Sequence, residues 1–433
     1  MAAGIFLGLP CRAPALEFNL RQIAGEKNAS REPVISETGL AAWTEYDSNE
    51  TSRAITDLTI YQNGERRSLS GESAAIFYGS AKPSVQSNSI VWIANYRNFP
   101  EAHSWVLREV PNRDEGATEL PALYKAVVTL SGEQTFVNLA DATNGVIVYT
   151  NSDMVITNIF DSGTNSAERM RRHPSGDTEI NFWDGGGDIV RVTTDLRHDF
   201  APSSWGRLIA WQKERGFPFG WEIMLWDNGV TKQMTTNFYY DMAPKVHKRQ
   251  VVWYGWDGYD FEIFLYDGDL DTTVQITSNR FDDVGPVIWD GMIAWEGYPA
   301  VEADIFVYKN GQVSKISDNV EDDINPRIWN GQVVWQAFDG DDFEIYLYDG
   351  QKPVKVTGNS FDDTNPDIRD GMITWMGYEG NWDAEIYAWD GTGEPVRLTD
   401  NEEEDRDPHT AGRRIIWQVD REGRSQIWLA EPK

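Results

Sequence analysis

The sequence contains very little cysteine and has a large deficit of basic residues. Cys11 is the only cysteine among 433 residues, which excludes an intrachain disulfide and a cysteine-based metal cluster. Lysine and arginine together number 38 against 69 aspartates and glutamates, a net charge of −31. A nucleic-acid backbone or an anionic membrane surface binds cationic proteins, so neither partner is expected. No apolar run approaches the roughly 20 residues that span a bilayer, so no membrane span is expected.

Short motifs of the common enzyme classes are also missing. The sequence has no H-E-x-x-H zinc motif, no G-x-S-x-G nucleophile turn, no P-loop and no dinucleotide-binding glycine pattern in a strand–helix context. Its five histidines are scattered, without a metal-binding or catalytic spacing. A non-catalytic role is therefore favoured, although enzymatic activity stays an open alternative, and no cofactor is expected.

Tryptophan, by contrast, is abundant, and part of it recurs at a regular interval. The chain has 19 tryptophans, and one series is spaced by 40 or 42 residues: Trp211, Trp253, Trp295, Trp335, Trp375 and Trp417. Each of these units begins with a proline: Pro202, Pro244, Pro286, Pro326, Pro366 and Pro408. A period of about 40–45 residues is typical of repeat architectures, among them the β-propeller.

One unit, residues 326–357, shows the strands that the repeat encodes. A short extended segment after Pro326 leads into the tight-turn pair Asn330-Gly331, which joins two strands. The run Q-V-V-W-Q that follows is apolar without polar alternation, as in a strand buried on both faces. Two further strands, E-I-Y-L-Y and V-K-V-T, are separated by Asp349-Gly350. Four antiparallel strands in each period predict an all-β fold, a single β-propeller.

The first half of the chain repeats this pattern less regularly. Residues 33–64 match one unit, 83–107 a second, and 145–193 a third with an insertion at 150–178. This count favours nine blades over eight. The last unit stops after its third strand, and residues 16–24 resemble a fourth strand, so we expect them to close the ring as the outer strand of the last blade.

These observations predict one propeller domain over residues 16–433. Degenerate blades are expected at 25–194 and regular blades at 195–433. Residues 1–15 contain a short apolar stretch followed by Ala13-Pro14-Ala15, and they are interpreted as a tail or the remnant of a secretory signal.

The repeat resembles the blade of TolB-type (PD40-like) propellers. Its pattern is Pro-x-Ile-x-Asp-Gly-x-Ile-x-Trp, followed by Glu-Ile-Tyr-x-x-Asp-Gly. The best copy comprises Pro366, Ile368, Asp370, Gly371, Ile373, Trp375, Glu385, Ile386, Tyr387, Asp390 and Gly391. It lacks the Ser-Pro that many members carry before the turn. The resemblance implies a periplasmic or secreted binding propeller, and a minority of such propellers, including polysaccharide lyases, act on carbohydrates.

An aspartate stands three positions before each repeat proline: Asp199, Asp241, Asp283, Asp323, Asp363 and Asp405. If these carboxylates form a collar at the upper face, the face where the innermost strands begin, they can hold a cation such as calcium. The alternative is that each aspartate accepts local backbone hydrogen bonds and caps its own turn. The regularity of the spacing favours this second interpretation, because a repeated residue usually serves the repeat.

The loops between second and third strands combine aromatic residues with acids. Aromatic rings with carboxylates suit a sugar ring or a cationic protein partner, although they also serve as lids over a blade. The candidate binding residues in these loops are Phe217, Trp221, Trp256, Tyr259, Tyr298, Phe338, Tyr378 and Trp382. A run such as Asp339-Gly340-Asp341-Asp342 resembles only a fragment of a calcium loop.

A basic cluster in the expected insertion is the last candidate. It consists of Arg169, Arg171, Arg172 and His173. The cluster suits an acidic ligand or the protein's own acidic rim, and long loops on rigid scaffolds tend to carry function.

Three classes of function remain after these observations. The favoured one is a non-catalytic binding or scaffold propeller that holds a protein partner or a glycan through its upper-face loops. The alternatives are a polysaccharide lyase or hydrolase with an upper-face active site, and a structural subunit of a larger extracellular or envelope assembly. Histidine, tyrosine and arginine converging in a deep pocket would favour the enzyme, and a broad apolar patch would favour the subunit.

Overall fold

The computed structural model describes most of the chain, and every regular element in the described part is a β-strand. The described residues are 16–25, 29–46, 55–69, 82–95, 178–186, 189–195, 197–215, 220–317, 319, 321–380, 383–421 and 424–433, with the backbone of four more strands between 124 and 172. Within these residues no helix is long and apolar enough to cross a membrane.

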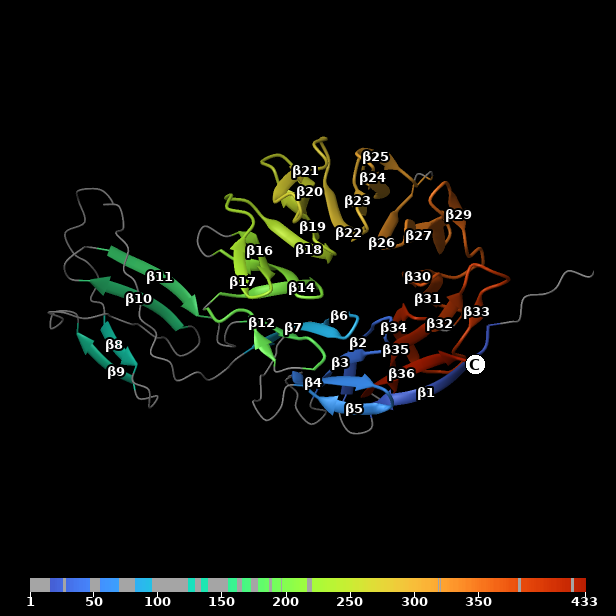
Figure 1. Cartoon of the computed structure of the whole chain (residues 1–433), viewed down its shortest axis with the longest axis horizontal. Helices are drawn as coiled ribbons and strands as arrows, with labels where there is room; N and C mark the ends of the chain where they lie inside the picture. The colour runs from blue at the N-terminus through green and yellow to red at the C-terminus, as the bar shows by residue number, and fades with distance from the viewer. Residues whose placement is uncertain are drawn as a thin grey trace, which may run out of the picture. The chain divides into compact units, whose positions relative to one another are not determined.

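Eight four-stranded sheets, blades 1 to 8, are arranged around a common centre (Figure 1). Blades 3 to 7 each consist of four consecutive strands, ordered from the innermost outward. They are β14 (Asp199–Trp205), β15 (Leu208–Glu214), β16 (Trp221–Asp227) and β17 (Val230–Gln233); β18 (Asp241–His247), β19 (Gln250–Trp256), β20 (Phe261–Asp267) and β21 (Thr272–Gln275); β22 (Asp283–Trp289), β23 (Met292–Gly297), β24 (Asp304–Lys309) and β25 (Gln312–Lys315); β26 (Asp323–Trp329), β27 (Gln332–Phe338), β28 (Phe343–Tyr348) and β29 (Pro353–Lys355); and β30 (Asp363–Arg369), β31 (Met372–Gly377), β32 (Glu385–Trp389) and β33 (Val396–Arg397).

The remaining three blades use strands from the first half of the chain and from both of its ends. Blade 1 is β2 (Ala29–Ile35), β3 (Ala41–Tyr46), β4 (Ile55–Gln62) and β5 (Glu65–Ser68). Blade 2 is β6 (Ser84–Gln86), β7 (Ser89–Asn95), β12 (Thr178–Trp183) and β13 (Val190–Arg191). Blade 8 is β34 (Glu404–Ala411), β35 (Arg414–Arg421), β36 (Arg424–Pro432) and, as its outer strand, β1 (Phe18–Ala24).

The count of nine blades is therefore wrong, and the described residues form eight. The second and third units of the sequence are two halves of blade 2. The second unit supplies the two inner strands, β6 and β7, and the third supplies the two outer ones, β12 and β13. A blade needs four paired strands, so each half on its own resembles a degraded unit, and the one blade is counted twice.

Residues 95–177 form a compact unit of their own, apart from the propeller. The insertion in blade 2 therefore spans more of the chain than the expected 150–178. Two antiparallel strand pairs are described in this unit: β8 (Tyr124–Val128) with β9 (Gln134–Asn138), and β10 (Val155–Asp161) with β11 (Ser166–Arg172). Residues 105–107 and 145–149, which also matched the repeat, lie outside the described residues.

The innermost strands follow one another around the centre in chain order, and β34 of the last blade contacts β2 of the first. At this seam β1 pairs antiparallel with β36, from Phe18 opposite Pro432 to Ala24 opposite Ile427. The two ends of the chain thus share one sheet.

A bulge at the repeat proline shapes the innermost strands. In β18 the pairing with β19 shifts between Met242 and Lys245, and the residue before Pro244, Ala243, has a φ of 51°. Proline has no N–H to donate to the ladder, and a bulge is one of the few places where a paired strand tolerates it. The bulge recurs in the other regular blades, so it positions the residue after each proline in the same way.

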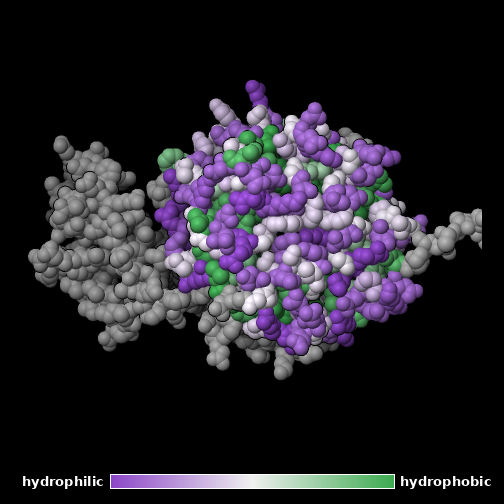
Figure 2. All heavy atoms as spheres, in the orientation of Figure 1, coloured by the Kyte–Doolittle hydropathy of each residue, from purple (hydrophilic) through white to green (hydrophobic). Residues whose placement is uncertain are grey.

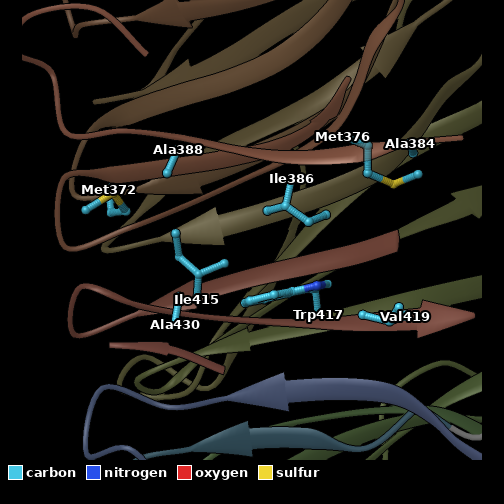
Figure 3. Close-up of a cluster of buried hydrophobic side chains, with 9 residues drawn as sticks. All are labelled: Met372, Met376, Ala384, Ile386, Ala388, Ile415, Trp417, Val419 and Ala430. Carbon is cyan, nitrogen blue, oxygen red and sulfur yellow. The ribbon is translucent and has the colours of Figure 1, made fainter. Parts of the chain in front are cut away.

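The hydrophobic core lies between neighbouring blades. The central tryptophan of the second strand is at most 1% exposed in seven blades: Trp43, Trp211, Trp253, Trp295, Trp335, Trp375 and Trp417. Figure 3 shows one such layer, in which Met376 and Ile386 of blade 7 face Ile415 and Trp417 of blade 8. A lone blade would leave both faces of its second strand in water, so stacking around a ring is what buries them.

Candidate functional site

The central channel contains a cavity of about 590 Å³ that is lined by the innermost strands of all eight blades. Each strand contributes the residue that follows its repeat proline: Val34, Ser84, Ser203, Lys245, Val287, Arg327, Asp367 and His409. The volume lies within the range of typical ligand pockets, about 300–1,000 Å³. The eight blades therefore present a ring of eight side chains to one common space.

Positive charge collects in this cavity, although the protein as a whole carries −31. Lys82, Lys245, Arg327 and Arg369 line it, against the single carboxylate of Asp367. Among the described residues, no carboxylate forms an ion pair with Lys82, Lys245 or Arg327. These cations come from blades 2, 4 and 6, so only the closed ring brings them to one space.

The environment of these cations shows that they are close enough to repel one another. Desolvation inside the ring, together with Arg327 and Lys82, lowers the pKa of Lys245 to about 8, although its side chain is exposed to the cavity. Burial also lowers the pKa of Lys82, and Arg327 contributes while Asp407 opposes it. An anionic ligand would relieve this repulsion, because it would add negative charge beside cations that form no ion pair within the described residues.

The carboxylate of Asp367 already has two partners within the protein. Its Oδ2 lies 3.2 Å from His409 Nδ1 and accepts a hydrogen bond of 2.9 Å from the backbone N–H of Thr410. Although burial opposes the change, these bonds lower the pKa of Asp367 to about 2. Burial lowers the pKa of His409, with Lys82 contributing, so this imidazole is neutral at neutral pH.

An aromatic layer lies two residues further along the innermost strands, toward the lower face of the ring. The ring centroids of Trp205 and His247 are 4.2 Å apart, and those of His247 and Trp289 are 4.5 Å apart. Arg369 lies over the Trp289 ring at 4.9 Å and also pairs with Glu37 at 3.2 Å. Burial lowers the pKa of His247 to about 4. The cavity thus combines cations with an aromatic surface.

The six candidate metal aspartates lie inside their own blades. Each accepts a hydrogen bond of 2.6–3.0 Å from the indole of the central tryptophan of the next strand. In blades 4, 5, 7 and 8 an asparagine four residues upstream donates to the other oxygen at 2.5–2.7 Å. Burial raises the pKa to about 7 at four of them: Asp199, Asp323, Asp363 and Asp405. In all six, the Oδ1 oxygen thus links the first two strands of the blade, whereas the Oδ2 oxygens of Asp199 and Asp323 have no hydrogen bond in the described part of the chain.

The candidate aromatic residues are distributed over different blades. Trp221 packs edge-on against Phe200 at 5.2 Å, Trp256 against Phe261 at 5.2 Å, and Phe338 lies 5.3 Å from Phe343. The Tyr298 hydroxyl donates to Glu296 at 3.1 Å, and Tyr378 packs against the core between blades 7 and 8.

Tyr259, at 88% exposed, is the one described candidate that projects largely into solvent. No ring pair in the described part of the chain joins two of these aromatic candidates.

The other candidates lie partly or wholly outside the described residues. Phe217, Trp382 and His173 are outside them. Arg169, Arg171 and Arg172 lie in β11 of the separate unit, opposite Asn158, Ile156 and Val155.

The sequence reasoning missed the cavity residues. A signal was present, because Lys245, Arg327, Asp367 and His409 all directly follow a repeat proline. Pattern analysis weighs what the units share, whereas the residue at this position differs from unit to unit.

The described residues on the face drawn in Figure 2 show no comparable concentration of one kind of side chain. On the face drawn in Figure 2, the described residues are largely hydrophilic, with hydrophobic side chains in small groups between them. A broad apolar patch, the feature expected of a structural subunit, is not seen on the described part of that face.

No family model matches the chain, and no curated protein matches it by sequence. Solved structures do match. The computationally designed Ika8 protein aligns with a TM-score of 0.52 at 12% identity, over 94% of this chain and 98% of that one. The β-propeller domain of the Trilobed protease from Pyrococcus furiosus aligns with 0.46 at 10% identity, over 82% and 96%. The putative TolB from Agrobacterium tumefaciens aligns with 0.36 at 12% identity, over 57% and 94%. At these identities the likeness concerns the fold alone, a β-propeller.

Proposed function

We propose that this β-propeller is a non-catalytic binding protein that takes a carboxylate-bearing glycan in its central cavity. The observation that carries the proposal is a set of cavity cations that form no ion pair with any described carboxylate, in an otherwise acidic protein: Lys82, Lys245 and Arg327. A lysine or arginine that faces a cavity without a counter-charge is suited to an anionic ligand.

The aromatic layer supports a sugar as the carrier of that charge. The rings of Trp205 and Trp289 line the same cavity as the cations. Aromatic faces stack on the apolar face of a sugar ring, and the cations pair with its carboxylate. An acidic glycan also suits the periplasmic or extracellular location expected from the sequence.

Calorimetric titration with an oligouronate and with a neutral oligosaccharide of equal length tests the proposal. The acidic compound is expected to bind and the neutral one not. Lys245→Met and Arg327→Met should each weaken binding at least tenfold, because a charge-assisted hydrogen bond contributes about 1.5–3 kcal/mol.

Lys248→Met is the matched control for Lys245→Met. Lys248 is an exposed lysine that pairs with Asp290 at the lower face, outside the cavity. The Lys248→Met variant should bind the oligouronate as the wild type does. Equal binding by Lys245→Met and the wild type would refute the cavity as the site. Capture of an acidic protein segment instead of an oligouronate would identify a protein partner.

A second candidate function, a polysaccharide lyase, is favoured by the pairing of His409 with Asp367. With Asp367 holding Nδ1, the neutral imidazole of His409 has its other nitrogen free to accept a proton. Arg327 would neutralise the uronate carboxylate while the C5 proton passes to His409. The bond from C4 to the leaving oxygen then breaks, a C4=C5 double bond forms, and the leaving oxygen takes a proton from water.

Ultraviolet absorbance of the unsaturated product distinguishes this lyase from the binding protein. An absorbance that grows with time and is lost in His409→Asn would establish the lyase. Binding without a change in absorbance would leave the non-catalytic function.

We also propose that β1 stabilises the closed ring by completing blade 8. The strand pairing between β1 and β36 and the ion pair of Arg21 with Glu431 at 2.7 Å support it. Removing residues 1–24 exposes the edge of β36, so the melting temperature should fall and the protein should associate. A truncated chain as stable and as monomeric as the full chain would contradict this role.

A further inference from the structure

Two upper-face loops of the propeller have nearly the same sequence and the same backbone hydrogen bonds. Residues 257–262 of blade 4 read D-G-Y-D-F-E, and residues 339–344 of blade 6 read D-G-D-D-F-E. The N–H of Asp257 donates to the Asp260 carbonyl at 3.1 Å, and that of Asp339 to the Asp342 carbonyl at 3.0 Å. The two loops are therefore structural copies that differ in their surroundings.

Each loop gathers three carboxylates. In blade 4 one oxygen each of Asp257, Asp260 and Glu262 lies within 4.8 Å of the others. Asp339, Asp342 and Glu344 form the same group in blade 6. Oxygens bound to one calcium ion at about 2.3–2.6 Å lie at most about 5 Å apart, so both groups have a compatible spacing.

The two clusters differ in what neutralises them. In blade 6 the ammonium of Lys355 lies 2.8 Å from Asp339 and 3.1 Å from Glu344. Although burial opposes the change, these contacts raise the pKa of Lys355 above its usual value. Lys355 thus supplies a built-in cation to the blade 6 cluster.

The equivalent residue in blade 4 is Gln275. It pairs with Phe264 of β20, as Lys355 pairs with Tyr346 of β28. Gln275 carries no charge, and no lysine, arginine or histidine in the described part of the chain forms an ion pair with the blade 4 cluster. The carboxylates of blade 4 therefore lack the counter-charge that the copy in blade 6 has.

Glu262 is the most deeply buried member of the blade 4 cluster. It is 0% exposed, and neither of its oxygens has a well-formed hydrogen bond. Asp260 is 8% exposed, and one of its oxygens has no hydrogen bond. A buried carboxylate without a partner is costly, and a bound cation removes that cost.

We propose that Asp257, Asp260 and Glu262 of blade 4 form a binding site for one calcium ion, in the place that the Lys355 ammonium takes in blade 6. The three ligands are all carboxylates, without histidine or cysteine, and calcium prefers such oxygen ligands. Asp257 is exposed, so water completes the coordination from the solvent side. The bound ion orders the loop that carries Trp256 and the exposed Tyr259.

Calorimetric titration of the chelator-treated full chain with CaCl2 at physiological ionic strength tests the site. One equivalent of calcium is expected, bound more tightly than magnesium, which dehydrates reluctantly. Gln275→Lys should weaken calcium binding at least tenfold, because it places an ammonium where Lys355 lies in the copy. Gln275 is exposed, so this variant folds as the wild type does.

Two further variants make the test specific. Asp349→Asn removes one exposed carboxylate from a lower-face turn and should leave the calcium affinity unchanged. Lys355→Gln should bind a second equivalent, because it gives blade 6 the surroundings of blade 4. Terbium luminescence excited through the aromatic rings of the loop provides an independent signal and should be lost in Gln275→Lys.

The proposal is overturned if the wild type shows no saturable binding of calcium, or if Gln275→Lys binds calcium as the wild type does. A single equivalent in Lys355→Gln would contradict the equivalence of the two loops. These measurements use no glycan, so their outcome is independent of the proposed function.

Discussion

Replacing Trp335 by phenylalanine tests whether the tryptophan–aspartate bond holds each blade together. Trp335 is 1% exposed, and its indole N–H donates to Asp323 Oδ1 at 2.7 Å. Phenylalanine retains one aromatic ring but removes this donor, and Asp323 is itself only 1% exposed. A buried acceptor left without its donor costs about 1–3 kcal/mol. The smaller ring loses a further ~1–2 kcal/mol of buried contact.

The expected destabilisation is therefore about 2–5 kcal/mol. A propeller of eight blades need not unfold in one step, so the melting temperature from calorimetry is a better measure than an extrapolated free energy. For a domain of this size a loss of 1 kcal/mol lowers the melting temperature by roughly 2 °C. Trp335→Phe should thus melt about 4–10 °C below the wild type.

The pH dependence of this loss provides a second criterion. Burial raises the pKa of Asp323 to about 7, against the hydrogen bond from Trp335. Below that pH the folded carboxyl is protonated and depends less on its donor, so the loss should be larger at about pH 8 than at about pH 5.5.

Two controls complete the experiment. Trp389→Phe removes an indole N–H that bonds to the Gly393 carbonyl at the surface, so it should change the melting temperature by no more than about 1–2 °C. Asp323→Asn keeps a side-chain carbonyl that accepts from Trp335, so it should cost less than Trp335→Phe. If Trp335→Phe melts within about 1 °C of the wild type at both pH values, the bond does not hold the blade and the reasoning is refuted.

Three further predictions concern stability. Four buried aspartates have a folded-state pKa raised to about 7: Asp199, Asp323, Asp363 and Asp405. They bind more protons in the folded than in the unfolded chain, so the melting temperature should fall as the pH rises from about 5.5 to 8. A melting temperature that rises over this range would contradict the raised pKa values. Lys245→Met should raise the melting temperature of the ligand-free protein by about 1–2 °C, because it removes one repelling cation, although solvent in the cavity screens most of its charge. An unchanged or lower melting temperature would contradict a destabilising repulsion at Lys245. Gly255→Ala should lower the stability by about 1–3 kcal/mol, because a Cβ there would lie 2.3 Å from Asp241 Oδ1. Gly186→Ala is the control: its Cβ meets no atom within 4 Å, so the same melting experiment should show almost no change.

The sequence was most informative where the units agree. The spacing of the tryptophans and prolines predicted four-stranded blades, because a blade is a local unit whose strands are neighbours along the chain. The aspartate before each proline was recognised as a repeated feature. Its partner, the indole of the next strand, could not be read from the spacing, because the pairing depends on the bulge that sets the register of the two strands.

The count of blades failed for the opposite reason. The chain leaves blade 2 after β7 and returns at β12, so one blade is split by residues 95–177. Local pattern cannot join two half-units across such a distance. Pairing across a long insertion is a property of the assembled sheet.

The fold class and the position of each regular blade were thus determined by the sequence alone, since both rest on short-range periodicity. The cavity was decided by the tertiary structure, because Lys82, Lys245 and Arg327 meet only when eight blades close around one centre. The contrast between Gln275 and Lys355 is visible in the sequence but acquires meaning only in the folded blade. There the pairing of the outer strands brings Lys355 to the blade 6 carboxylates and leaves those of blade 4 without a counter-charge.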